Sequence, residues 1–145
     1  MYTMDTTVPD HVVAVADNIR PADLEECLAE GFEDPAVALF WSVEMSDGTC
    51  TVLLDDKPVG IWGFSDEHDG SCLVWTVGTE GLVREPLALH KASIAFRDEL
   101  LEKFDTLRNT VFRNNKVHIA WLRSLGAVFT ETPDPDFLEF EITKQ

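Results

Sequence analysis

Two histidines and one acidic turn carry the side chains of this chain that best suit acid–base or metal chemistry. A histidine can donate a proton near neutral pH, so His90 and His118 are candidate general acids. Nothing in the sequence places either beside a leaving group, and both also suit ordinary positions on a helix. The turn residues Glu67, His68 and Asp69 could bind a metal, but three consecutive residues rarely converge on one ion. We therefore predict no catalytic residue and no metal site.

The spacing of the cysteines and the lack of common enzyme motifs also give no support for a catalytic or metal site. The chain has three cysteines, Cys27, Cys50 and Cys72, which is an odd number and includes no CxxC pair. We therefore expect buried thiols in a reducing compartment. The sequence contains no GxSxG, phosphate-binding loop or HExxH motif. These patterns give no support to serine-hydrolase, P-loop nucleotidase or zinc-protease chemistry.

The charge is strongly acidic and unevenly distributed. The 145 residues carry a net charge of −16, yet residues 84–123 hold eight basic and five acidic residues, a net of +3. The rest of the chain is therefore −19. Such asymmetry suits packing between neighbouring subunits, including a homo-oligomer, and it also arises by chance on a long amphipathic helix. An excess of acid disfavours direct binding to nucleic acid.

Membrane insertion and secretion are not indicated. No apolar run approaches the ~18 residues that a spanning helix needs. The first ten residues, MYTMDTTVPD, lack the basic and apolar regions of a secretory signal. We expect no membrane partner.

Periodicity and turn residues predict an alternating order of elements. Strands are expected at 11–20, 49–54, 58–64, 71–77, 106–113, 127–130 and 137–143. Helices are expected at 22–31, 35–45 and 88–104, and from 114 or 115 to 125. Asp34 is the expected cap of the second helix, with Pro35 in its first turn.

The best-defined segment is the helix and strand between 114 and 129, which Asn114 or Asn115 would cap. The inner face of this helix is expected to comprise Val117, Ala120, Trp121, Ser124 and Leu125. Ile119 and Leu122 make much of the remaining surface apolar as well, so Trp121 is expected to be buried against the sheet. Gly126 is expected to end the helix in a left-handed conformation.

This segment resembles the C-terminal helix–strand motif of the GNAT acyltransferase superfamily, with matches at Asn115, Ala120, Leu125 and Gly126. Together with residues 96–107 and a closing strand that ends at 142–144, it resembles a virion-morphogenesis family of short-tailed phages, described as internal virion proteins with a GNAT-like fold. The resemblance covers about residues 84–145. It implies one α/β (α+β) domain over 1–145, with a mixed, twisted sheet of six to seven strands and helices on both faces.

The superfamily holds the pyrophosphate of coenzyme A on the amides of a Q/R-x-x-G-x-G/A loop, which here corresponds to residues 78–86. The motif is incomplete, because Glu80 and Glu85 add negative charge and Pro86 lacks an amide. Leu122 stands where the superfamily has its tyrosine acid. If coenzyme A binds, the resemblance implies these contacts: Val77, Thr79, Gly81, Arg84 and Asn115. We expect no cofactor, with acetyl-CoA as the alternative.

The leading hypothesis is a non-catalytic protein of virion morphogenesis. It would contact internal core, portal or tail-connector proteins in the host cytoplasm during assembly, and retention in the virion stays open. One alternative is a CoA-dependent N-acyltransferase with an atypical cofactor loop. Another is an acidic protein that binds a host factor by imitating the charge of nucleic acid.

Overall fold

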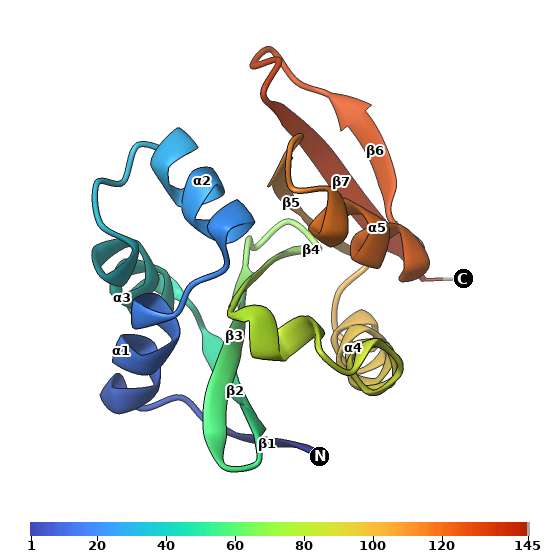
Figure 1. Ribbon diagram of the computed structural model, residues 1–145. Helices are drawn as coiled ribbons and strands as arrows, with labels where there is room; N and C mark the ends of the chain where they lie inside the picture. The colour runs from blue at the N-terminus through green and yellow to red at the C-terminus, as the bar shows by residue number, and fades with distance from the viewer. Residues whose placement is uncertain (145) are drawn as a thin grey trace. The chain divides into compact units, whose positions relative to one another are not determined.

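A computed structural model describes residues 1–144, and Figure 1 shows their helices and strands. Within these residues seven strands follow the order β1-β2-β3-β4-β5-β7-β6. The sheet is mixed, because β4 (Ser71–Gly78) and β5 (Thr106–Phe112) pair in parallel, whereas β5 pairs antiparallel with β7 (Phe137–Thr143). The expected α/β class and mixed sheet are confirmed.

The internal contacts divide the chain into two compact units. Unit 1 comprises 1–65 and 75–89, and unit 2 comprises 66–74 and 90–145. The expectation of one domain over 1–145 stays a prediction, and Gln145 lies outside the described residues.

In unit 1, β1 (Tyr2–Thr6), β2 (Gly48–Leu54) and β3 (Lys57–Asp66) form an antiparallel meander. Asp55 and Asp56 make its two-residue turn with positive φ angles of 50° and 69°, as type I′ turns require. Side chains alternate across β3: Ile61 packs with α1 and α3, while Gly60 faces Leu82. Both faces of this strand are therefore covered.

The predicted strand at 11–20 is wrong. This stretch forms most of α1 (Pro9–Asp17), which buries Val12, Val15 and Ala16 at helical spacing. Pro9 occupies the first turn, where its missing amide costs nothing. The run of valines is typical of a strand, but the burial of these side chains against α3 (Pro35–Met45) stabilises the helix. Strand β1 was not predicted because it has only five residues, most of them exposed, and only Tyr2 and Met4 are large and apolar.

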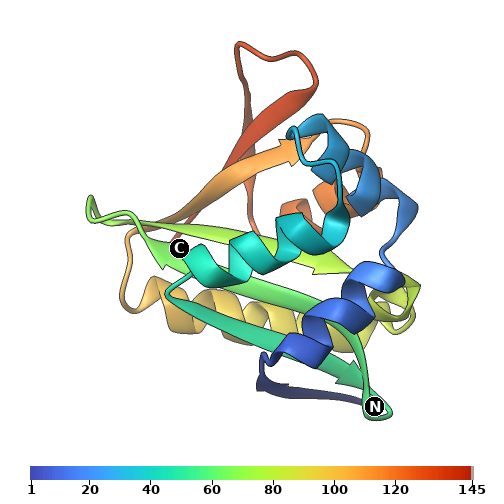
Figure 2. The same ribbon diagram turned by 90° about the vertical axis from the view of Figure 1, so that its left-hand side faces the viewer.

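The other helices of unit 1 begin where the sequence indicates. α2 (Pro21–Ala29) and α3 each start at a proline, and Asp34 caps α3 by accepting a 2.8 Å hydrogen bond from the amide of Ala36. Figure 2, which turns the view by 90°, shows α1 and α3 side by side. Their shared core contains Val12, Val15, Leu39 and Ile61.

Unit 2 contains most of α4 (Pro86–Leu101), with β5, α5 (Lys116–Ser124), β6 (Val128–Glu131) and β7. Strands β5 and β7 pair along their whole length, from Thr106 opposite Thr143 to Phe112 opposite Phe137. The main buried side chains of this unit are Leu100, Leu101, Leu107, Val111, Phe112, Ile119, Leu122, Leu125, Phe137, Phe140 and Ile142.

The exit of α5 is as predicted, but its expected inner face is not. Gly126 has φ 95°, and the amides of Gly126 and Ala127 donate to the carbonyls of Arg123 and Leu122, which forms a Schellman motif. Ile119 and Leu122 are buried, whereas Val117 is 52% exposed. Of the other expected inner-face residues, Leu125 is buried, but Ala120 and Ser124 are exposed and Trp121 is only half-buried.

Candidate functional site

The loop after β4 is the candidate cofactor site, and its backbone is bonded within itself. Thr79 organises it: its hydroxyl donates to the carbonyl of Val59 at 3.0 Å and accepts from the amide of Gly81 at 3.2 Å. The 3₁₀ helix η1 (Glu80–Val83) follows. The amide of Leu82 donates to the carbonyl of Thr79, and that of Arg84 donates to Gly81.

Tyr2, from strand β1, holds the end of this loop. Its hydroxyl lies 2.8 Å from the carbonyl oxygens of both Gly81 and Leu82, which share its one hydrogen, and it accepts from the amide of Glu85 at 3.1 Å. Burial raises the pKa of the Tyr2 hydroxyl above its usual value. The hydroxyl therefore stays protonated and keeps its hydrogen for the carbonyls.

A buried ion pair lies at the end of β4 and is bonded to its last residue. The carboxylate of Asp23 accepts from Arg20 at 3.0 Å and from the amide of Gly78 at 2.9 Å, and the amide of Arg20 donates to the carbonyl of Gly78. The side chains of Asp23 and Arg20 are only 6% and 9% exposed. The carboxylate of Asp23 thus occupies a backbone donor at the strand end, and Arg20 balances its charge.

These contacts decide whether the loop suits a pyrophosphate. An anion at such a loop must accept hydrogen bonds from free amides. The amides of Gly78, Gly81, Leu82, Arg84 and Glu85 all donate within unit 1. These five amides are therefore already bonded within the chain and are not free to bind an anion.

The two loop glycines have a packing explanation. A β-carbon on Gly81 would lie 2.6 Å from Val59, and one on Gly78 would collide with Leu82. Leu82 is buried in the same contact. The glycines therefore admit the side chains of Val59 and Leu82.

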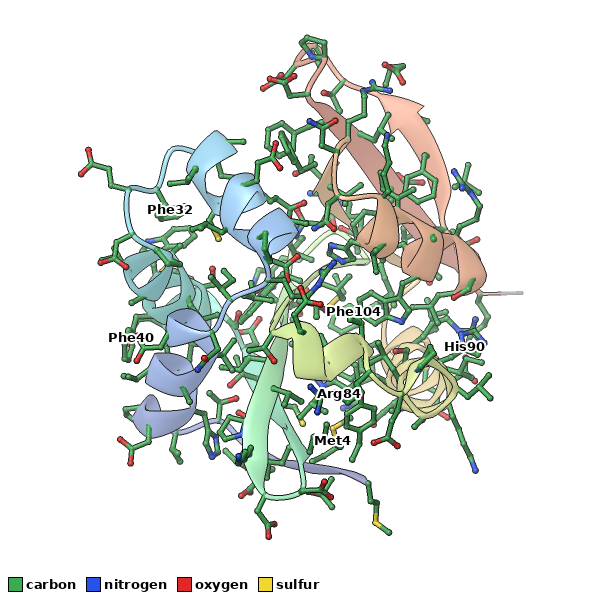
Figure 3. The ribbon with its side chains drawn as sticks, in the orientation of Figure 1. Met4, Phe32, Phe40, Arg84, His90 and Phe104 are labelled. Carbon is green, nitrogen blue, oxygen red and sulfur yellow. The ribbon has the colours of Figure 1, made fainter. Side chains whose placement is uncertain are left out.

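The five candidate cofactor residues are divided between the units. Val77, Thr79, Gly81 and Arg84 belong to unit 1, where Val77 packs on the core and Thr79 is buried. Figure 3 labels the side chain of Arg84 beside η1. Asn115 belongs to unit 2: it is fully buried at the N-cap of α5, but its side chain does not cap the helix.

Both candidate histidines have helix-packing contacts. A ring nitrogen of His90 lies 3.2 Å from the hydroxyl of Ser124, which donates to the carbonyl of Trp121 at 2.6 Å. His118 stacks on Trp121 with ring centres 5.4 Å apart. The indole of Trp121 donates to Ser93 of α4 at 2.9 Å. A serine and a histidine in contact could relay a proton, but here they join α4 to α5.

The acidic turn and the cysteines form no metal centre. Glu67 pairs with Arg108 at 3.5 Å, while Asp69 accepts from Ser71, whose bonds lower the pKa of that carboxyl. Across residues 1–144 no group of histidine, cysteine and acidic side chains could hold a metal ion. Burial raises the pKa of the Cys27 thiol to about 12, so this thiol is a poor nucleophile.

Unit 2 contains a hollow of about 480 Å³ that the sequence did not suggest. It lies between α4, the end of α5 and the end of β7, and three basic residues line it: Arg97, Arg123 and Lys144. Arg97 donates to the carbonyl of Leu125 at 3.0 Å and to Asp98 at 2.9 Å, and Arg123 lies over the ring of Phe129. Two of the three cations thus already have contacts within the unit.

Over the described part of the chain, no helix is long and apolar enough to cross a bilayer.

Solved structures share this fold. An acetyltransferase of the GNAT family from Bacillus anthracis aligns with a TM-score of 0.72 at 14% identity, over 98% of this chain and 94% of that one. A Pyrococcus horikoshii OT3 protein aligns with a TM-score of 0.76 at 14% identity, over 100% and 99% of the two chains. An acetyltransferase from Thermus thermophilus gives 0.71 at 12% identity, over 99% and 97%. At these identities the likeness establishes a GNAT-like fold and no activity.

Sequence comparison identifies the family. The family model described as "Bacteriophage T7, probable scaffold protein Gp13" matches residues 67–132. The probable scaffold protein gp13 of Escherichia phage T7 is 36% identical over 94 residues, which cover 59% of this chain and 68% of that protein. The chain therefore belongs to the family of the phage T7 probable scaffold protein Gp13, on a GNAT-like fold.

Proposed function

We propose that this protein is a non-catalytic factor of phage particle assembly that acts by contacting structural proteins. Its partners would be internal core, portal or tail-connector proteins, met in the host cytoplasm while particles form. The biological setting is supported by the relationship to a phage protein named as a probable scaffold protein.

The hydrogen bonding of the loop after β4 carries the non-catalytic part of the proposal. Five amides of this loop and strand end donate within the chain, and a buried carboxylate lies at the end of β4. A pyrophosphate that bound to these five amides would have to replace their present acceptors, which include Asp23 and Tyr2. Since a buried unsatisfied group costs about 1–3 kcal/mol, this rearrangement opposes binding.

Calorimetry with acetyl-CoA tests the absence of cofactor binding. The wild-type protein is expected to show no heat of binding at about 100 μM ligand, a ceiling equivalent to roughly −5.5 kcal/mol. The matched variants are Glu80→Gln/Glu85→Gln, which removes the loop charges, and Tyr2→Phe, which releases the Glu85 amide. Saturable binding by the wild type would overturn the proposal and favour the N-acyltransferase alternative.

Co-expression tests the contact with structural proteins. The protein is produced with each core, portal or tail-connector protein of its phage in turn, and the pairs are purified in moderate salt. One stable pair is expected. If no pair forms, and the protein instead forms a strongly salt-dependent complex with a host DNA-binding protein, the acidic-mimic alternative replaces this proposal.

A further inference from the structure

The outer side of α3 is an exposed apolar surface with an acid in its middle. Four large side chains share it and are 41% to 61% exposed: Val37, Phe40, Trp41 and Met45. Glu44 lies among them at helical spacing. We call these five residues the α3 face. Figure 3 labels Phe40 on the left-hand side of the view, where α3 lies.

A helix that is apolar on both sides is normally covered on both. The inner side of α3 is buried through Ala38 and Leu39. Tryptophan, phenylalanine and methionine are the side chains that interfaces favour, and an exposed cluster of them marks a docking surface. The surroundings are acidic, since residues 9–47 contain ten acidic residues and one arginine.

The outer side of α5 has the opposite charge. Lys116, Ala120 and Arg123 lie along one exposed strip, with Val117 and Ser124 beside it. We call these five residues the α5 face. Residues 106–130 include four basic side chains and no acidic one.

We propose that the α3 face of one molecule docks on the α5 face of a second copy of this chain. The apolar side chains of α3 would cover Val117 and Ala120, and Glu44 would approach Lys116 and Arg123. Charge selects this pairing: two α3 faces would bring two strongly acidic surfaces together, and two α5 faces would bring two basic ones together. The contact is heterologous, so each copy can bind two others.

This inference rests on the proposed assembly function and names one partner for it. It differs from contact with core, portal or connector proteins, which is tested by co-expression. If the chain does not self-associate, the assembly function can still hold through those partners. If self-association is found and no structural protein binds, the assembly function fails and this interface stands.

Sedimentation velocity of the purified chain, over a concentration series at low and high salt, gives the first measurement. The wild type is expected to sediment faster as its concentration rises. This association is expected to weaken about tenfold between low and high salt, because screening weakens charge pairing. A protein that remains monomeric up to about 1 mM at low salt overturns the proposal.

Two variants break one face each. Phe40→Gln/Trp41→Gln removes the aromatic side chains of the α3 face and inserts a good helix former. Lys116→Glu/Val117→Ser cancels the net positive charge of the α5 face, because Arg123 then stands against a glutamate. An acid in the first turn of a helix favours the helix, so folding is protected. Leu87→Gln, at an α4 position that is 86% exposed, is the matched control. Each face variant is expected to be monomeric, and the control is expected to associate like the wild type.

Mixing the two face variants is decisive. Phe40→Gln/Trp41→Gln keeps its α5 face, and Lys116→Glu/Val117→Ser keeps its α3 face. The mixture is therefore expected to form a one-to-one dimer that binds no further copy. A mixture that stays monomeric, or an α5-face variant that still self-associates, overturns the proposal. If either double variant loses its helical circular dichroism, Glu44→Lys and Lys116→Glu replace them as single changes.

Discussion

The loop after β4 and the exit of α5 both use glycine, but for different physical reasons. Gly126 has φ 95°, a conformation that side chains rarely adopt, and it ends a helix. Gly78 and Gly81 have no positive φ angle and are needed because Leu82 and Val59 occupy the space of a β-carbon. A glycine in a sequence therefore marks either a backbone requirement or a close contact. Two of the predictions below separate these cases, and the others test the surroundings of the two regions.

The largest loss of stability is expected at the ion pair of Arg20 and Asp23 at the end of β4. Asp23→Ala should lower the free energy of unfolding by about 3–5 kcal/mol, because it leaves Arg20 buried without its carboxylate. Urea denaturation measures this loss. The control is Arg20→Met/Asp23→Leu, which removes both charges and should cost much less. Equal losses in both would mean that packing, and not charge, matters there.

The two sides of α5 should respond unequally to truncation. Leu122 is 4% exposed and Val117 is 52% exposed. Leu122→Ala is expected to cost about 2–5 kcal/mol, and Val117→Ala within about 0.5 kcal/mol of zero. Comparable losses in thermal or urea unfolding would show that the helix buries the side first expected from the sequence. Leu122→Tyr is not expected to create acetyltransferase activity, since this position lies in the core.

Gly78→Ala should cost about 1–3 kcal/mol by overpacking against Leu82. Because the side chain of Leu82 causes the overpacking, a smaller side chain at that position should relieve it. Gly78→Ala is therefore expected to lower the free energy of unfolding less in a Leu82→Val background than in the wild type. Unfolding of the four proteins in this double-mutant cycle measures the coupling.

Gly126→Ala should cost about 1 kcal/mol through backbone strain. No side-chain trimming is expected to recover it, and Gly126→Asn should cost less than Gly126→Ala, because asparagine tolerates this conformation. A neutral Gly126→Val would contradict the left-handed exit. These two glycines together test the distinction drawn above.

The last prediction concerns pH. Burial raises the pKa of Cys27 from its ordinary 9.0 to about 12. A raised pKa stabilises the folded state fully below pH 9, and this contribution is lost as the pH rises toward 12. Cys27→Ala is expected to lose less stability than the wild type between pH 9 and pH 11 in urea denaturation. Identical pH dependence in the two proteins would place the sensitive group elsewhere.

Local patterns predicted most of the elements. Proline and aspartate at the start of α3, and glycine at the end of α5, fix helix ends through backbone chemistry that operates within a few residues. The alternation of residues 137–143 predicted β7 with the bounds that the structure has. The wrong predictions concern segments whose sequence fits two structures equally well. The valines of α1 suit a strand or a helix, and α5 offers two apolar stripes.

By itself the sequence determined the order of elements from residue 21 onward, the GNAT-like class and the departure of the cofactor loop from its motif. Only the tertiary structure decided what the loop does with its amides. Asp23 reaches Gly78 across 55 positions, and Tyr2 reaches Glu85 across 83. Periodicity describes neighbours within a few residues, whereas a buried donor is satisfied by whichever acceptor the fold brings to it.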